Sequence, residues 1–214
     1  MRDMNLKTNK PVILAIFGKS AAGKDTLKDI LRNYPTFNIM QQWTTRPMRD
    51  NECQNCEYHF CSIEDFTKQL LSPESMLEAA SYKDWYYGTP TSEIIQGKIN
   101  VGIFGPKVLD CLIEEQRNYN IFFVEVQTPD RERLFRSLKR NKQVDCSEVC
   151  RRFLADEKDF NEFHLKLVEE IEPEKICYLN GECLNTFGNT VGYELIEMVT
   201  KTFGPIKKNN SNEN

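Results

Sequence analysis

The stretch VILAIFGKSAAGKDT, residues 12–26, decides the fold. Six consecutive apolar residues, 12–17, predict a strand that is buried on both faces, as strands of parallel sheets are. Gly18 to Gly23 form a loop of small residues, and from Lys24 onward apolar residues recur at helical spacing. Backbone N–H groups converge where such a loop enters a helix, and the helix dipole adds positive potential there. The stretch therefore predicts an anion-binding site between a strand and a helix.

The spacing Gly18-x4-Gly23-Lys24 is that of a P-loop, in which the lysine reaches the β and γ phosphates of a nucleotide. Asp25 stands where a Ser or Thr normally holds Mg²⁺, and the hydroxyl follows at Thr26, which is our predicted metal-binding residue. A chance glycine-rich turn is the alternative, but the buried strand and the amphipathic helix favour a P-loop. The predicted ATP-binding residues are Gly18, Lys19, Ser20, Ala21, Ala22, Gly23, Lys24, Asp25 and Thr26.

The composition is that of an ordinary globular protein, with 40% hydrophobic and 28% charged residues among 214. Lys and Arg total 28 against 32 Asp and Glu, so the net charge of −4 predicts no general affinity for nucleic acid or membranes. Apolar runs are of strand length, and we recognise no export signal. We therefore expect a cytoplasmic protein whose eight cysteines are reduced thiols.

Beyond the P-loop, apolar segments of strand length alternate with segments of helical periodicity. This alternation is typical of an α/β fold with a parallel sheet. The predicted strands are residues 12–17, 37–43, 99–104, 121–126 and 176–179. The predicted helices begin near residues 24, 62, 106, 128, 148 and 191. Residues 44–61 are polar and rich in turn formers, which predicts a lobe of hairpins and loops.

Four motifs follow the P-loop in a fixed order: TTRPMR at 44–49, YHF at 58–60, LEAA at 77–80 and YYGT at 86–89. Arg46 and Arg49 place two guanidinium groups on one loop, which suits a phosphate other than the one in the P-loop. In order and spacing these motifs resemble those of the guanylate kinase family, and the resemblance covers about residues 11–204.

The resemblance implies an ATP- and Mg²⁺-dependent nucleoside monophosphate kinase whose partners are ATP and, by preference, GMP or dGMP. Glu78 and Thr89 match residues that read the guanine base. Arg152 matches a lid arginine that closes over the transferring phosphoryl group, and Arg136 and Arg140 have the spacing of two further lid arginines, shifted by one residue. The residues that match the acceptor-phosphate site are Arg46, Arg49, Tyr58 and Tyr87. With Lys24, the three lid arginines are the predicted catalytic residues.

Two departures from the family leave the acceptor base open. Gln42, which we retain as a predicted substrate-binding residue, stands where the family usually has Ser. Ile103-Phe104-Gly105 matches a strand end that usually reads Asp-x-Asp, and one of those aspartates helps to read guanine. The alternatives are a kinase of broader or different acceptor range and a catalytically inactive interaction module. Lys24 and the intact glycine loop argue against the inactive module.

A cysteine cluster has the residue types and spacing of a zinc site: Cys53, Cys56, His59 and Cys61. His59 belongs to the YHF motif, however, and a strand there would send neighbouring side chains to opposite faces. We therefore favour packing residues over a metal site. Taken singly, Arg46 and Arg49 would be a solvated loop pair, Glu78 a surface carboxylate, and the arginines of 131–152 a basic helical face; the ordered motifs favour functional roles.

The expected organisation is a P-loop kinase core with one inserted lobe. The core comprises residues 11–41 and 99–204, and its short lid lies at about 138–152. Residues 42–98 form the monophosphate-binding lobe, and residues 1–10 and 205–214 form flexible termini.

Overall fold

The computed structural model describes residues 10–49, 52–56, 58–72, 75–82, 84–139 and 145–205, without the side chains of 185–189. Nearly all of both expected flexible termini, most of the loop of the expected lid, and Arg140 lie outside the described residues.

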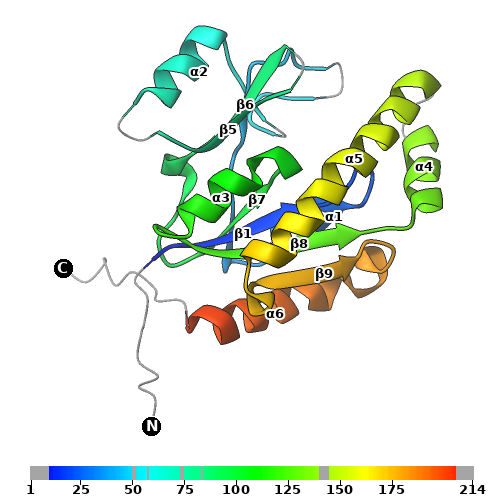
Figure 1. Cartoon of the computed structure of the whole chain (residues 1–214). Helices are drawn as coiled ribbons and strands as arrows, with labels where there is room; N and C mark the ends of the chain where they lie inside the picture. The colour runs from blue at the N-terminus through cyan, green and yellow to red at the C-terminus, as the bar shows by residue number, and fades with distance from the viewer. Residues whose placement is uncertain are drawn as a thin grey trace.

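Five parallel strands form the core sheet, in the order β2-β7-β1-β8-β9 (Figure 1). Their bounds are β1 (Val12–Phe17), β2 (Phe37–Ile39), β7 (Ile99–Ile103), β8 (Asn120–Gln127) and β9 (Ile176–Asn180). All six residues of β1 are buried, because helices cover both faces of this central strand. The loop after β1 therefore lies at the carboxyl edge of the sheet between two neighbouring strands, where α/β proteins commonly bind ligands.

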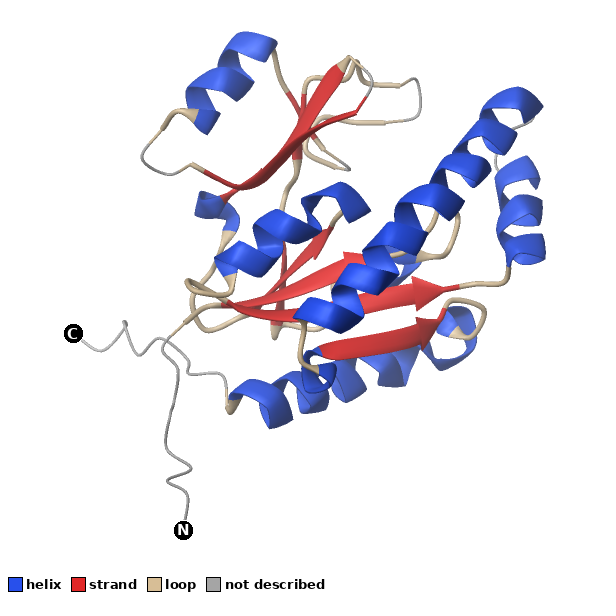
Figure 2. Cartoon of the chain, viewed as in Figure 1, coloured by secondary structure: helices blue, strands red, loops and turns tan. Residues whose placement is uncertain are grey.

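Helices on both faces of the sheet give three layers (Figure 2). Helices α1 (Lys24–Leu31) and α6 (Leu184–Phe203) share one buried apolar cluster with β1. Helices α3 (Leu109–Glu115) and α5 (Cys146–Glu170) share the cluster on the opposite face, and α4 (Asp130–Lys139) packs beside α5. Three short 3₁₀ helices occupy Thr91–Glu93, Pro106–Val108 and Pro173–Lys175. The predicted α/β fold with a parallel core sheet is confirmed.

A second, mixed sheet has the strand order β4-β3-β6-β5. Its strands are β3 (Trp43–Thr44), β4 (His59–Phe60), β5 (Met76–Tyr82) and β6 (Trp85–Pro90), and α2 (Ile63–Leu70) packs against β5 and β6. Helix α2 begins where the sequence predicts, because the Ser62 hydroxyl accepts a hydrogen bond from the Asp65 N–H at 3.0 Å. Leu77 of β5 is buried in the apolar cluster of the core, which anchors this sheet to the core.

Two sequence predictions need correction. The strand predicted at 37–43 is two short strands in different sheets, because the chain leaves the core sheet after Met40, which stays buried. The last helix begins at Leu184, which packs in the core, seven residues before the predicted start at 191. In the described part of the chain, no helix has both the length and the hydropathy to cross a membrane.

Candidate active site

The loop between β1 and α1 depends on glycine at two positions. Gly18 has φ +152°, and a Cβ there would lie 2.6 Å from the Val126 carbonyl oxygen; Gly23, with φ +111°, precedes the first residue of α1. Gly23 has no side chain to cap α1, which suits a helix N-terminus that receives an anion. The Lys24 ammonium donates to the Gly18 carbonyl at 2.6 Å and to the Lys19 carbonyl at 3.1 Å. The loop thus has the backbone conformation expected of a phosphate-binding loop, and the Lys24 side chain folds back over it.

Arg46 and Arg49 lie in the segment that follows β3 of the second sheet. There they contact the carboxylate of Glu52, which sequence reasoning missed. Arg46 is 5% exposed, and its Nη2 lies 2.8 Å from Glu52 Oε1. The Arg49 N–H donates to the other oxygen of Glu52 at 2.9 Å, while the Arg49 side chain is 58% exposed. Burial opposes ionisation of Glu52, but the hydrogen bond from Arg46 holds the pKa of this carboxyl below its ordinary value. Glu52 therefore orients the Arg46 side chain and holds the backbone at Arg49, the two arginines of the predicted acceptor-phosphate site.

Tyr58 and Tyr87 lie beside these arginines, with ring centroids 5.9 Å apart. The Arg46 guanidinium carbon lies 5.6 Å from the centre of the Tyr58 ring. Burial, followed by the proximity of Tyr87 and Asp25, raises the pKa of Tyr58 to about 12, so its hydroxyl is a hydrogen-bond donor at neutral pH.

Glu78, Thr89 and Gln42, predicted from separate motifs, meet at one buried carboxylate. Glu78 in β5 is opposite Thr89 in β6, and each is 2% exposed. Glu78 Oε1 accepts from the Thr89 hydroxyl at 2.8 Å and from Gln42 Nε2 at 3.3 Å. Burial raises the pKa of Glu78, and the hydrogen bonds from Thr89 and Gln42 partly oppose that rise. Gly105, the other departure from the family pattern, has open space where a Cβ would stand.

Comparison with known proteins identifies the family. The guanylate kinase family model matches residues 8–179. The chain is 30% identical over 149 residues to the guanylate kinase of Gloeobacter violaceus, covering 67% of this chain and 70% of that protein. It is also 30% identical over 170 residues to the guanylate kinase of Onion yellows phytoplasma, covering 75% and 76%. This chain belongs to the guanylate kinase family.

One further relative matches over a smaller share of its length, and one solved structure matches over nearly all of its chain. Identity to the guanylate kinase of Thermosynechococcus vestitus is 34% over 85 residues, 39% of this chain and 44% of that protein, so this match spans less than half of that relative. The crystal structure of guanylate kinase from Anaplasma phagocytophilum has a TM-score of 0.58 at 16% identity, covering 92% of this chain and 97% of that one. This likeness shows that the two proteins share the guanylate kinase fold.

Arg136 and Arg152 are the predicted lid arginines that the structure describes, and they lie in different surroundings. Arg136 in α4 contacts the carbonyl side of the phosphate loop, since its Nη1 lies 3.4 Å from the oxygens of both Ala21 and Ala22. Arg152 in α5 bonds Glu148 at 2.8 Å and is half-exposed. Hydrogen bonds from Arg151 and Arg152 lower the pKa of Glu148. The predicted catalytic roles of both arginines, and of Arg140 outside the described residues, stay predictions.

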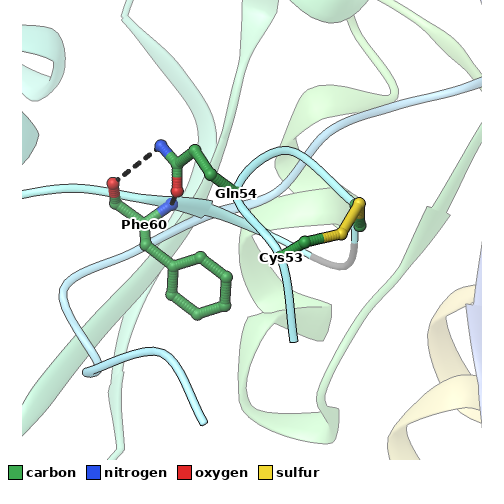
Figure 3. Close-up of a disulfide and its surroundings, with 4 residues drawn as sticks. Cys53, Gln54 and Phe60 are labelled. Atoms are coloured by element: carbon green, nitrogen blue, oxygen red, sulfur yellow. Dashed lines mark hydrogen bonds between the residues drawn. A yellow bond between two sulfur atoms is a disulfide. The ribbon is translucent and has the colours of Figure 1, made fainter. Parts of the chain in front are cut away.

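Cys53 and Cys56 form a disulfide in the connection between β3 and β4, which also carries Arg46 and Arg49 and is called the acceptor-phosphate loop below (Figure 3). This disulfide corrects the prediction that all eight cysteines are reduced. The other six cysteines form no disulfide in the described part of the chain. Between the two half-cystines, the Gln54 side chain donates to the Phe60 carbonyl and accepts from the Phe60 N–H, each at 3.0 Å. Across the described ranges, no group of three or more His, Cys, Asp or Glu side chains could hold a metal ion.

Sequence reasoning also missed a cluster of charged side chains around the buried Arg133. It treated this residue only as one of the arginines of residues 131–152. Arg133 is 2% exposed and lies between α5 and the phosphate loop. Its neighbours in α4 are mostly charged, so the sequence contains no apolar pattern that would mark this arginine as buried.

Proposed function

We propose that this chain is an ATP-dependent kinase that phosphorylates GMP or dGMP: ATP + GMP → ADP + GDP. The observation on which the acceptor depends is the buried carboxylate of Glu78, oriented by Thr89 and Gln42. Guanine presents two adjacent donors, N1–H and the N2 amino group, and one carboxylate can accept from both. Burying an ionised carboxylate is unfavourable, and those two donors would compensate the cost when the ligand is bound.

The acceptor phosphate would be held by Arg46 and Arg49, with Tyr58 as an additional donor. Glu52 supports this role because it fixes the Arg46 side chain before the ligand arrives, so less side-chain entropy is lost on binding, and it holds the Arg49 backbone N–H. Arg46 is also covered by the Tyr58 and Phe60 rings, at 5.6 and 5.3 Å. A guanidinium that is shielded from water attracts a phosphate more strongly than one in open water.

The donor nucleotide would be ATP, bound at the phosphate loop with Lys24 on its β and γ phosphates. The first turn of α1 offers oxygen ligands of the type that Mg²⁺ prefers, the Thr26 hydroxyl and the Asp25 carboxylate. Magnesium, when bound, would neutralise charge on the phosphates. In phosphoryl transfer, the protein itself contributes alignment and positive charge, since little covalent chemistry is required of its side chains.

A second candidate function is a kinase of broader acceptor range. Gln42 offers an amide in place of the hydroxyl usual in the family, and the open space at Gly105 lacks a carboxylate that would help to read guanine. Both features favour weaker discrimination among bases than a complete guanine site would give.

A coupled assay of ADP release with a panel of ribo- and deoxynucleoside monophosphates tests the proposal. The expected result is Mg²⁺-dependent turnover with the highest kcat/KM for GMP or dGMP. Equal kcat/KM for several bases would support the second candidate. Absence of turnover with every monophosphate would refute both and favour an interaction module.

A further inference from the structure

Arg133 joins three acidic residues in a buried ion-pair cluster that the proposed reaction does not use. Its guanidinium lies 2.8 Å from Asp130, 3.1 Å from Glu157 and 3.3 Å from Asp156. The Phe153 ring covers the guanidinium at 4.7 Å. Arg133 belongs to α4, whereas Asp156 and Glu157 belong to α5, so the cluster ties these two helices together.

The same cluster holds the phosphate loop at Lys19 and Ser20. Asp156 Oδ2 accepts from the Ser20 N–H at 2.7 Å, and Arg133 Nη1 donates to the Ser20 carbonyl at 3.3 Å. Glu157 Oε1 accepts from the Lys19 ammonium at 2.6 Å. Both backbone groups of Ser20 are therefore fixed by side chains that are more than a hundred residues away in the sequence.

The backbone next to Ser20 needs such support. Ala21 has φ +60°, a left-handed conformation that is unfavourable for a residue with a Cβ. A strained conformation persists only where its surroundings hold it in place. Ala21 is followed by Ala22 and Gly23, which bring no bulky side chain to fix the loop from within.

Burial distinguishes this cluster from ordinary surface ion pairs. Arg133 is 2% exposed and the Asp156 side chain 17%, so water screens this ion pair less than it screens the more exposed Asp130 and Glu157. Exposed pairs of the same kind contribute little to structure or binding. A buried cluster on the loop that receives phosphates is placed to affect nucleotide binding.

We infer that Asp156, Glu157 and Arg133 are positioning residues that hold Lys19 and Ser20 so that the phosphate loop keeps its nucleotide-binding shape. They act through the Ser20 backbone and the Lys19 side chain and do not themselves touch the phosphates. Because they belong to α4 and α5, they also connect the loop to the helix that bears Arg152. This inference rests on the proposed binding of a nucleotide at this loop.

Isothermal titration with Mg²⁺-ADP and, separately, with GMP tests the inference without turnover. Asp156→Ala removes the acceptor of the Ser20 N–H, and we expect the Kd for ADP to rise by about 10-fold, as for loss of a hydrogen bond to a charged group. The Kd for GMP should stay unchanged, since the contacts described for Arg133, Asp156 and Glu157 are with the phosphate loop, α4 and α5, not with residues of the acceptor lobe. Asp156→Asn keeps an acceptor oxygen and should give an intermediate Kd for ADP.

Glu162→Gln is the matched control, because it removes a carboxylate from an exposed position of the same helix. Circular dichroism shows whether each variant is folded, and Asp156→Asn replaces Asp156→Ala if the latter does not fold. Equal loss of ADP and GMP binding would indicate a structural lesion and overturn the inference. Unchanged or tighter ADP binding by both Asp156 variants would also overturn it. Failure of the unmutated chain to bind ADP would instead refute the proposed function, and the inference with it.

Discussion

The phosphate loop and the acceptor lobe present their ligand-binding groups in different ways. The loop offers backbone groups and one lysine from a single contiguous segment, residues 18–24. The lobe offers side chains brought from two strands and from the segments on either side of β3. Each polar group is oriented by another: Glu78 by Gln42 and Thr89, Arg46 by Glu52. Backbone groups can bind any nucleotide phosphate, whereas paired side chains can select one base. In the proposed reaction, this difference assigns general phosphate binding to the loop and acceptor choice to the lobe.

The largest effect is expected at the lysine of the loop. Lys24→Ala should lower kcat by at least ~10²-fold, because it removes a preorganised charge at the transferring phosphoryl group. GMP affinity should be unchanged, since the lobe is intact. Steady-state kinetics with a GMP titration measures both quantities. Lys201→Ala, on the exposed last turn of α6, is the control, and near-normal turnover of Lys24→Ala would contradict the assignment of the loop.

The second effect is expected at the buried carboxylate of the lobe. Glu78→Gln should lower kcat/KM for GMP by roughly 5- to 150-fold, which is the discrimination that one bidentate contact with a base provides. ADP binding should be unchanged. Burial raises the pKa of Glu78, so ionising it in the folded protein is unfavourable. Its stabilising contribution is present below the unfolded-state pKa and is lost as pH rises through the folded-state pKa. Glu78→Gln should therefore match or exceed the unmutated Tm at neutral pH.

The pH profile supplies the control for that variant. Because the ionised form accepts from guanine, kcat/KM for GMP should rise with pH through the raised pKa of Glu78. The Glu78→Gln profile should lack this rise. A lower Tm of the variant at neutral pH, together with an unchanged pH profile, would mean that Glu78 is structural.

The disulfide in the acceptor-phosphate loop should have a smaller effect. Cys53 follows Glu52 directly, and Cys56 precedes Tyr58 by two residues, so the bond restrains both sides of the site. Reduction should raise KM for GMP by roughly 5-fold, since ordering one further residue on binding costs about 1 kcal/mol. KM for ATP should not change. The double variant Cys53→Ser and Cys56→Ser should show the higher KM with or without a dithiol reductant; a KM equal to that of the oxidised protein would contradict this prediction.

The smallest effect concerns a contact between α5 and the lobe. Arg151 Nη2 donates to the Tyr82 hydroxyl at 2.9 Å, and both side chains are about half exposed. Tyr82→Phe should change kcat by no more than about 3-fold, since exposed polar contacts are weak. A tenfold loss would show that this contact controls closure of the lobe on the core, and the same kinetic assay decides between the two outcomes.

The contrast between a contiguous phosphate loop and a lobe assembled from distant segments also explains which features the sequence predicted. The strand, loop and helix of residues 12–31 follow from local periodicity and glycine spacing, and the structure reproduces them. Strands β3 and β4 are two residues long each, too short for a period, so residues 44–61 were predicted only as hairpins and loops. Gln42, Glu78 and Thr89 were identified through family motifs; nothing in their local sequence marks them as neighbours.

Long-range and turn-dependent features were not predicted. Glu52 and Arg133 gain their partners through folding, and both lie in polar sequence where burial has no pattern. The prediction of reduced cysteines rested on the expected compartment. The Cys53–Cys56 pair depends instead on a tight turn, in which the Cys56 N–H donates to the Cys53 carbonyl at 3.2 Å.

The most direct test of the central claim compares GMP, IMP and AMP as acceptors. GMP offers N1–H and the N2 amino group to Glu78, IMP offers N1–H alone, and AMP offers neither. The account predicts that kcat/KM falls in the order GMP, IMP, AMP, and that the differences shrink in Glu78→Gln. Equal values for GMP and AMP in the unmutated protein would contradict a guanine site in the lobe.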